Sequence, residues 1–191
     1  KHSWIFGEFH NDYETILKIY NKNYKLEDFC YLVTKSFKYK SNIVNQDLFE
    51  AKDIRTSLNF GHTLAHVLEA LAEDHAIQYI PHGIAVAHGL LFIFNSGLIS
   101  QTKDHEDTIE ILKDLTKKYP IVHIKEITLI EIEKLIIQDK KNEDKSLCLL
   151  SLPSYGHFSL LIQKAEIPPV TQKFSVTYIS KLMNEYINTF S

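Results

Sequence analysis

Three histidines lie close together in the sequence, at spacings that suit the binding of a metal ion. His62 and His66 are four residues apart, so on a helix their imidazole rings lie on one face, about 6 Å from each other. His82 follows between Pro81 and Gly83, two residues that suit the start of a second helix. Imidazole nitrogens are common zinc ligands, and a catalytic zinc usually takes about three protein ligands and keeps one position open. The spacing therefore favours a metal site but does not decide which histidines bind the ion.

The same histidines also allow a structural interpretation. A histidine on a half-apolar helix is often a hydrogen-bonded core or boundary residue, because buried polar groups find partners. Polar side chains on nearby helices that otherwise have apolar faces to bury, namely Asn59, Arg55 and Lys40, favour a catalytic site. At this point both interpretations stay open.

Helices are predicted to position these side chains. Apolar residues recur at helical spacing in Tyr13 to Tyr20, Leu26 to Val44, Leu58 to Leu71, Ile84 to Leu98 and Ile109 to Leu115. Thr128 and Glu131 form a capping-box pattern, which predicts a further helix over Leu129 to Ile137. A last amphipathic helix is predicted over roughly Ser175 to Tyr186.

A minor pair of short strands completes the prediction. Apolar runs at Ser146 to Leu152 and Phe158 to Ile162 are separated by a turn sequence that contains Pro153 and Gly156, which is typical of a small hairpin or two edge strands. The sequence has no internal repeat and no low-complexity linker. We therefore expect one mainly α domain over residues 1–191, with a short strand pair.

Bulk composition limits the possible functions. The net charge of −3 comes from 21 basic and 24 acidic residues spread along the chain, which gives no reason to expect nucleic acid or an anionic membrane as a partner. Cys30 and Cys148 are far apart, so a reducing cytoplasm is the simplest compartment. No apolar run is long enough to cross a bilayer, and no signal-peptide pattern is present.

Two features suggest that this chain is a piece of a larger protein. Its only methionine is Met183, and its first residues, Lys1 to Phe6, already have the character of half-buried structure. With six glycines in all, the chain shows no glycine-rich phosphate loop. A nucleotide site, where one is needed, is expected to come from elsewhere.

The histidine segments resemble a known family signature. The patterns Arg55-x-x-Leu-Asn59-Phe-Gly-His62-Thr-x-x-His66 and His82-Gly83-x-Ala-Val-Ala-x-Gly89 are similar to those of the 3-dehydroquinate synthases, within the sugar phosphate cyclases. The resemblance continues upstream and downstream, in Lys40-x-x-x-Val44-x-x-Asp47-x-x-Glu50, in Asp139-Lys140-Lys141-Asn142 and in Lys1-His2-Ser3-Trp4-Ile5. It implies the helical C-terminal domain of the dehydroquinate synthase-like fold, with the N-terminal nucleotide-binding domain absent from this chain.

The resemblance also implies a role for each matching residue. The metal, zinc or cobalt, would be held by His62, by His82 and by a glutamate three residues before Lys1, which this chain does not contain. The residues implied in catalysis are Lys1, His66 and Lys40. Those implied in substrate binding are Asn59, Arg55, Glu50, Lys140 and Lys141; Arg55 would reach a phosphate or carboxylate in its own or a neighbouring subunit, Glu50 would orient the cations, and one of the two lysines would meet the substrate.

The family's reaction, as the resemblance implies it, converts 3-deoxy-arabino-heptulosonate 7-phosphate into 3-dehydroquinate and phosphate in the shikimate pathway of aromatic amino acid biosynthesis. The full enzyme would be an NAD- and metal-dependent lyase and a homodimer, and the isolated chain would be inactive. Three departures loosen the assignment of substrate: Ile84 replaces a common glutamate, Ala65 a common glycine, and one extra residue lies between Glu50 and Arg55. Alternatives are another sugar phosphate cyclase, a related metal-dependent polyol dehydrogenase, or a non-catalytic helical binding domain.

Overall fold

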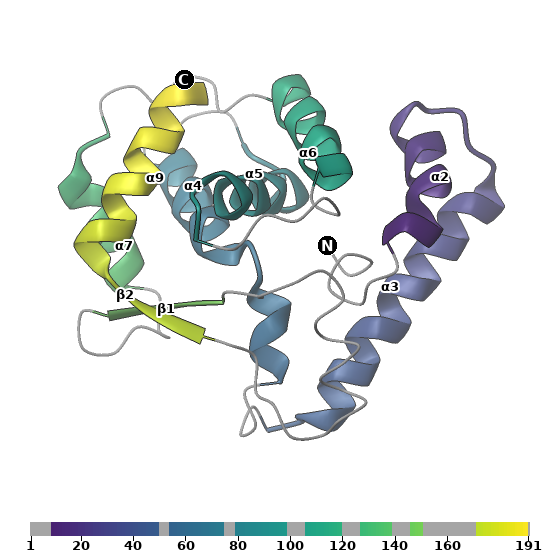
Figure 1. Cartoon of the computed structure of the whole chain (residues 1–191), viewed down its shortest axis with the longest axis horizontal. Helices are drawn as coiled ribbons and strands as arrows, with labels where there is room; N and C mark the ends of the chain where they lie inside the picture. Colours follow the sequence, from purple (N-terminus) through teal and green to yellow (C-terminus); the bar gives the residue numbers. More distant parts are fainter. Residues whose placement is uncertain are drawn as a thin grey trace. The chain divides into compact units, whose positions relative to one another are not determined.

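The computed structural model describes residues 9–49, 54–74, 79–98, 106–119, 127–138, 146–150 and 171–190. These residues form helices and one antiparallel pair of strands (Figure 1). The mainly α fold class predicted from the sequence is confirmed. The chain divides into two compact units. Among the described residues, the first unit ends at Leu58 and the second begins at Asn59.

The first unit contains a helical hairpin made of α2 (Phe9–Tyr20) and α3 (Leu26–Gln46). Both helices were predicted, and each is a few residues longer than its apolar pattern. The chain reverses between them through Lys22, whose φ of 57° lies in the left-handed region. The Asn23 amide then donates a hydrogen bond to the Lys18 carbonyl at 2.9 Å, which satisfies an end carbonyl of α2.

A buried carboxylate fastens the two helices of this hairpin together. Asp12 on α2 is fully buried, and its Oδ1 accepts hydrogen bonds from Tyr31 Oη at 3.0 Å and from Lys35 Nζ at 2.7 Å on α3. Burial opposes the charge of Lys35, but the hydrogen bonds to Asp12 and Tyr31 outweigh it and raise the pKa of Lys35 above its ordinary value. Because a buried charge is tolerated only when it is paired, this contact fixes how α2 lies against α3, the helix that carries Lys40.

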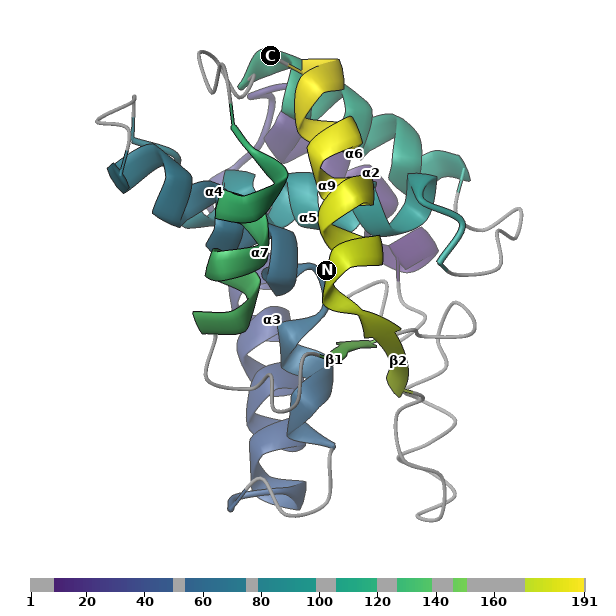
Figure 2. The same ribbon diagram turned by 90° about the vertical axis from the view of Figure 1, so that its left-hand side faces the viewer.

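The second unit is organised around one buried helix. α5 (His82–Asn95) is buried at every position from Ala85 to Phe94. It contacts α4 (His62–Asp74) and α6 (Glu106–Lys118), while α7 (Leu129–Gln138) contacts both α4 and α9 (Val176–Phe190). Figures 1 and 2 show α9 and α7 side by side. The core of this unit includes the buried side chains Phe60, Leu64, Leu68, Leu71, Leu91, Phe94, Ile132, Ile136, Ile179, Met183 and Ile187.

The start of α4 differs from the prediction. The apolar pattern predicted one helix from Leu58, but a 3-10 helix, η1 (Arg55–Asn59), ends before α4 begins at His62. Gly61 separates them because its φ of +81° cannot continue a right-handed helix. A Cβ on Gly89 of α5 would overlap the carbonyl oxygen of Gly61. The prediction was therefore wrong at this point, since a tertiary contact between two glycines sets where α4 begins.

A local signal fixed the start of α7 as predicted, whereas α5 ends at Asn95, before the predicted end at Leu98. At the start of α7 the Thr128 amide donates to Glu131 Oε2 at 2.8 Å, and the Glu131 amide donates to Thr128 Oγ1 at 3.3 Å. This is the predicted capping box. After α5, Gly97 has a φ of +71°, a conformation in which glycine commonly ends a helix.

The strand pair is confirmed in part. β1 (Ser146–Leu150) runs antiparallel to β2 (Thr171–Ser175), with Ser146 opposite Ser175. The first strand was predicted, but its partner here is a polar segment that the sequence pattern did not indicate. The other predicted strand, Phe158 to Ile162, lies outside the described residues. β2 leads directly into α9, where Ser175 Oγ accepts the Tyr178 amide at 3.2 Å and so caps the helix.

Within the ranges described above, no helix combines the length and the apolar character that crossing a membrane would require.

Candidate metal and substrate site

The three histidines come together where two helices of the second unit begin. His62 is the first residue of α4, His66 lies one turn further on, and His82 is the first residue of α5. The ring centroid of His62 lies 5.7 Å from that of His66 and 5.2 Å from that of His82. The rings of His62 and His82 are thus neighbours although they come from different helices, as the spacing predicts.

Hydrogen bonds place the proton of both rings on the same nitrogen. His62 Nδ1 lies 3.2 Å from the carbonyl oxygen of Phe60, and His82 Nδ1 lies 2.9 Å from Glu69 Oε1. Carbonyl and carboxylate oxygens only accept hydrogen bonds, so Nδ1 is the donor in each ring. In a neutral imidazole the other nitrogen, Nε2, then carries the lone pair. Each ring is therefore held in the tautomer that binds a metal through Nε2.

The separation of the two rings fits one shared ion. With a zinc to nitrogen bond of about 2.1 Å and tetrahedral geometry, two imidazoles bound to one zinc have ring centroids about 5 Å apart. The distance between His62 and His82 matches this. A third protein ligand is still needed, and among the described residues no three histidine, cysteine or carboxylate side chains are grouped to hold an ion. The histidine pair thus fits part of a zinc or cobalt site.

Glu69 was missed in the sequence and belongs to this cluster. It lies on α4, three residues after His66 and seven after His62, so all three residues share one helical face. The spacing His66-x-x-Glu69 was the signal that could have identified it, because a carboxylate on the same helical face as the two histidines can accept a hydrogen bond from another imidazole.

His88, which lies on α5 with His82, fits the structural interpretation of a histidine. It is fully buried, with Nε2 3.2 Å from the carbonyl oxygen of Tyr119 and Nδ1 3.1 Å from Tyr186 Oη. The carbonyl requires a hydrogen on Nε2, so Nδ1 accepts the tyrosine hydroxyl. Burial lowers the pKa of His88, against the weaker opposing effect of the Tyr119 carbonyl, and raises the pKa of Tyr186. His88 is therefore a neutral core residue.

The other predicted residues divide between the two units. Asn59, half-buried, ends η1 three residues before His62, in the second unit. Lys40, exposed on α3, and Arg55 belong to the first unit. The backbone amide of Arg55 donates to Asp47 Oδ2 at 3.1 Å, and its Nη1 donates to the Leu48 carbonyl at 3.3 Å. The roles assigned to these side chains stay predictions.

Four predicted site residues fall outside the described part of the chain. They are Lys1, Glu50, Lys140 and Lys141.

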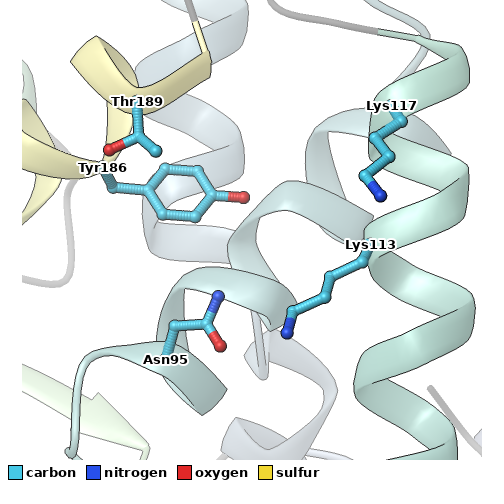
Figure 3. Close-up of a pocket in the computed structure, with 5 residues that line it drawn as sticks. All are labelled: Asn95, Lys113, Lys117, Tyr186 and Thr189. Carbon is cyan, nitrogen blue, oxygen red and sulfur yellow. The ribbon is translucent and has the colours of Figure 1, made fainter.

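A hollow elsewhere in the second unit does not contribute to the histidine cluster. It has a volume of about 430 Å³ and is lined by Asn95, Lys113, Lys117, Tyr186 and Thr189, from α5, α6 and α9 (Figure 3). Its two lysines are exposed, and Asn95 ends the helix that His82 begins. At 1.5 Å per residue, the two ends of α5 are about 20 Å apart.

Comparisons with known proteins agree with the signature in the sequence. A family model described as "3-dehydroquinate synthase C-terminal" matches residues 1–142. A 3-dehydroquinate synthase of Thermoplasma volcanium is 39% identical over 112 residues, which are 58% of this chain and 30% of that protein. One of Oceanobacillus iheyensis is 32% identical over 159 residues, which are 79% of this chain and 37% of the relative. The chain thus spans about a third of the length of the curated relatives it matches.

Proposed function

The chain belongs to the 3-dehydroquinate synthase family, and we propose that it forms the metal- and substrate-binding domain of an enzyme that makes 3-dehydroquinate. The substrate would be 3-deoxy-arabino-heptulosonate 7-phosphate, and inorganic phosphate would be the second product, as in the shikimate pathway of aromatic amino acid biosynthesis. The observation that carries this proposal is the pair of imidazoles, His62 and His82, with ring centroids 5.2 Å apart and a hydrogen on Nδ1 of each.

These two histidines would hold a divalent metal, zinc or cobalt, through Nε2. The third ligand would be a glutamate outside these 191 residues, expected three positions before Lys1. When bound, the ion supplies Lewis-acid stabilisation of a substrate hydroxyl or carbonyl oxygen. The fit of the residues to a metal rests on their tautomers and on the distance between the rings.

The remaining residues would bind and orient an anionic substrate. The exposed ring of His66, 5.7 Å from that of His62, would move a proton to or from a substrate oxygen. His82 also begins α5, and the positive end of a helix dipole favours an anion beside it. Asn59 would donate a hydrogen bond to a substrate hydroxyl or accept one from it.

The cationic side chains would neutralise the phosphate and carboxylate of the substrate. A guanidinium such as that of Arg55 binds an oxyanion by two parallel hydrogen bonds, whereas an ammonium group acts as a point charge. Lys1, Lys40 and one of Lys140 and Lys141 would supply ammonium groups, and Glu50 would orient them.

The hydride acceptor would be NAD, bound by a domain outside this chain. Two observations support this proposal. The sequence has no glycine-rich phosphate loop, and the chain spans only about a third of the length of its relatives. We also propose a homodimer, in which Arg55 serves its own or the neighbouring site, and a cytoplasmic location, on the strength of two widely separated cysteines.

An activity assay tests this proposal. The protein with its full natural sequence should release phosphate and form 3-dehydroquinate when given the heptulosonate phosphate, NAD and zinc. The 191-residue chain alone should show no turnover, because its sequence has no glycine-rich phosphate loop and does not contain the proposed third ligand. Turnover by the chain alone would refute the proposal that the nucleotide site and the third ligand lie outside these residues. A different cyclic product from the full protein would identify it as another sugar phosphate cyclase.

A further inference from the structure

Glu69 makes a contact in the histidine cluster that neither the family signature nor the sequence analysis had assigned. Its Oε1 lies 2.9 Å from His82 Nδ1, and it reaches from α4 to the first residue of α5. The side chain of His82 is 58% exposed and that of Glu69 is 31% exposed. The pair therefore lies at the surface, where an ion pair by itself adds little stability.

The contact matters more for the chemistry of the ring than for stability. A neutral imidazole in water prefers to carry its hydrogen on Nε2, which leaves the lone pair on Nδ1. In His82 the carboxylate accepts from Nδ1, so the hydrogen stays on Nδ1 and Nε2 becomes the basic nitrogen. Because the side chain of His82 is largely exposed, packing against neighbouring groups does little to hold this ring.

In His62 the hydrogen on Nδ1 is held by a backbone carbonyl, whereas in His82 it is held by the side chain of Glu69. The Phe60 carbonyl is part of the turn that Gly61 forms before α4, so the tautomer of His62 is set by the backbone. For His82 it is set by one side chain that a single substitution removes. A metal site made of both rings would therefore depend on Glu69 without Glu69 binding the metal.

We propose that Glu69 is a positioning residue: it holds His82 with the hydrogen on Nδ1 and so presents Nε2 to a divalent metal. This inference rests on the proposed function for the ion that His82 would bind, but the tautomer itself can be observed without any metal.

Two variants and one control separate this role from a general effect of the helix. Glu69→Ala removes the acceptor, while Glu69→Gln keeps an oxygen that can accept from Nδ1. Glu73→Ala removes an exposed carboxylate from the next turn of α4 and causes the same change in net charge. Alanine and glutamine both favour a helix, so all three variants are expected to fold.

The first readout is the tautomer of His82 in the metal-free protein, from the nitrogen chemical shifts of its ring. The wild type and Glu73→Ala should carry the hydrogen on Nδ1. Glu69→Ala should shift it mainly to Nε2, and Glu69→Gln should be intermediate. An unchanged tautomer in Glu69→Ala overturns the proposal.

The second readout is the zinc affinity of the protein with its full natural sequence. Loss of a carboxylate behind a ligating histidine typically weakens binding 10- to 100-fold, so Glu69→Ala should weaken zinc binding by about that factor and Glu69→Gln by less. Equal affinities for Glu69→Ala and Glu73→Ala would overturn the proposal even with a changed tautomer. A wild type that binds no zinc would instead refute the proposed metal site, while the tautomer still decides what Glu69 does to His82.

Discussion

At the scale of single residues, position decides what a histidine does in this protein. His62, His66 and His82 lie at two helix starts, and the rings of His66 and His82 each lie within 6 Å of the ring of His62. His88 lies on the same helix as His82 but is fully buried, and both of its nitrogens are hydrogen-bonded within the core. His88 is thus a structural residue of the core. Metal and substrate binding are proposed only for the other three histidines.

The burial of His88 predicts a loss of stability in acid. The unfolded imidazole gains its proton near pH 6.5, whereas the folded protein binds that proton only at lower pH, because burial lowers the pKa of His88. The unfolded state therefore binds more protons in this window, and the free energy of unfolding falls as the pH drops below about 6.5. The slope that one proton contributes is at most about 1.4 kcal/mol per pH unit.

Urea unfolding at several pH values measures this effect. His88→Gln can still accept from Tyr186 and donate to Tyr119, but it does not titrate, so the variant should lose less stability between pH 6.5 and lower pH than the wild type. A direct NMR titration of the His88 ring in the wild type checks the same point. Parallel stability curves, or a ring that titrates at or above pH 6.5, would contradict the account.

At the scale of elements, two glycines set how the helices that carry the histidines meet. Gly61 turns the chain into α4, and Gly89 lets α5 approach the carbonyl of Gly61 so closely that no side chain fits between them. α4 and α5 contact each other, which brings His62 and Glu69 to His82. The geometry of the cluster therefore depends on a backbone contact away from the rings.

Gly89→Ala is expected to destabilise the protein. The added methyl group would overlap the Gly61 carbonyl, and overpacking of this kind costs about 1 to 3 kcal/mol or more when backbone must move. Gly83→Ala is the matched control, because a Cβ at Gly83 meets nothing within 4 Å. Since alanine favours a helix, that variant should be neutral or more stable by up to about 1 kcal/mol.

Chemical denaturation of both variants measures the difference. Equal stability of Gly89→Ala and Gly83→Ala would contradict the overlap inferred between residue 89 and the Gly61 carbonyl.

At the scale of the whole molecule, the sequence predicted what local patterns determine. The helices follow from apolar periodicity, the α7 start from Thr128 and Glu131, and the proximity of His62 and His82 from their places at helix starts. What it could not predict depends on contacts between distant segments. The break at Gly61 follows from Gly89, and β2 is a polar segment that is a strand because it pairs with β1.

The candidate site shows the same division. His62 and His66 could be identified from spacing on one helix, and His82 from its place between Pro81 and Gly83 at the start of the next. The family signature then assigned His62 and His82 as the metal ligands. Glu69 was missed, although it shares a helical face with His62 and His66, because its partner His82 lies on another helix, 13 residues further along the chain. Roles for Lys40 and Arg55 came only from the resemblance to the family, since an isolated lysine or arginine in a sequence is usually a solvated surface side chain.

The central claim is that His62 and His82 bind the same metal ion, and the zinc content of the purified protein tests it most directly. It is best measured on the full natural sequence, for the wild type, His62→Ala, His82→Ala and His66→Ala. About one zinc per chain is expected in the wild type and in His66→Ala, and little or none in the other two variants. Zinc content that is unchanged by removal of His62 or His82, with at most a loss of stability, would contradict the metal site and favour a non-catalytic helical binding domain.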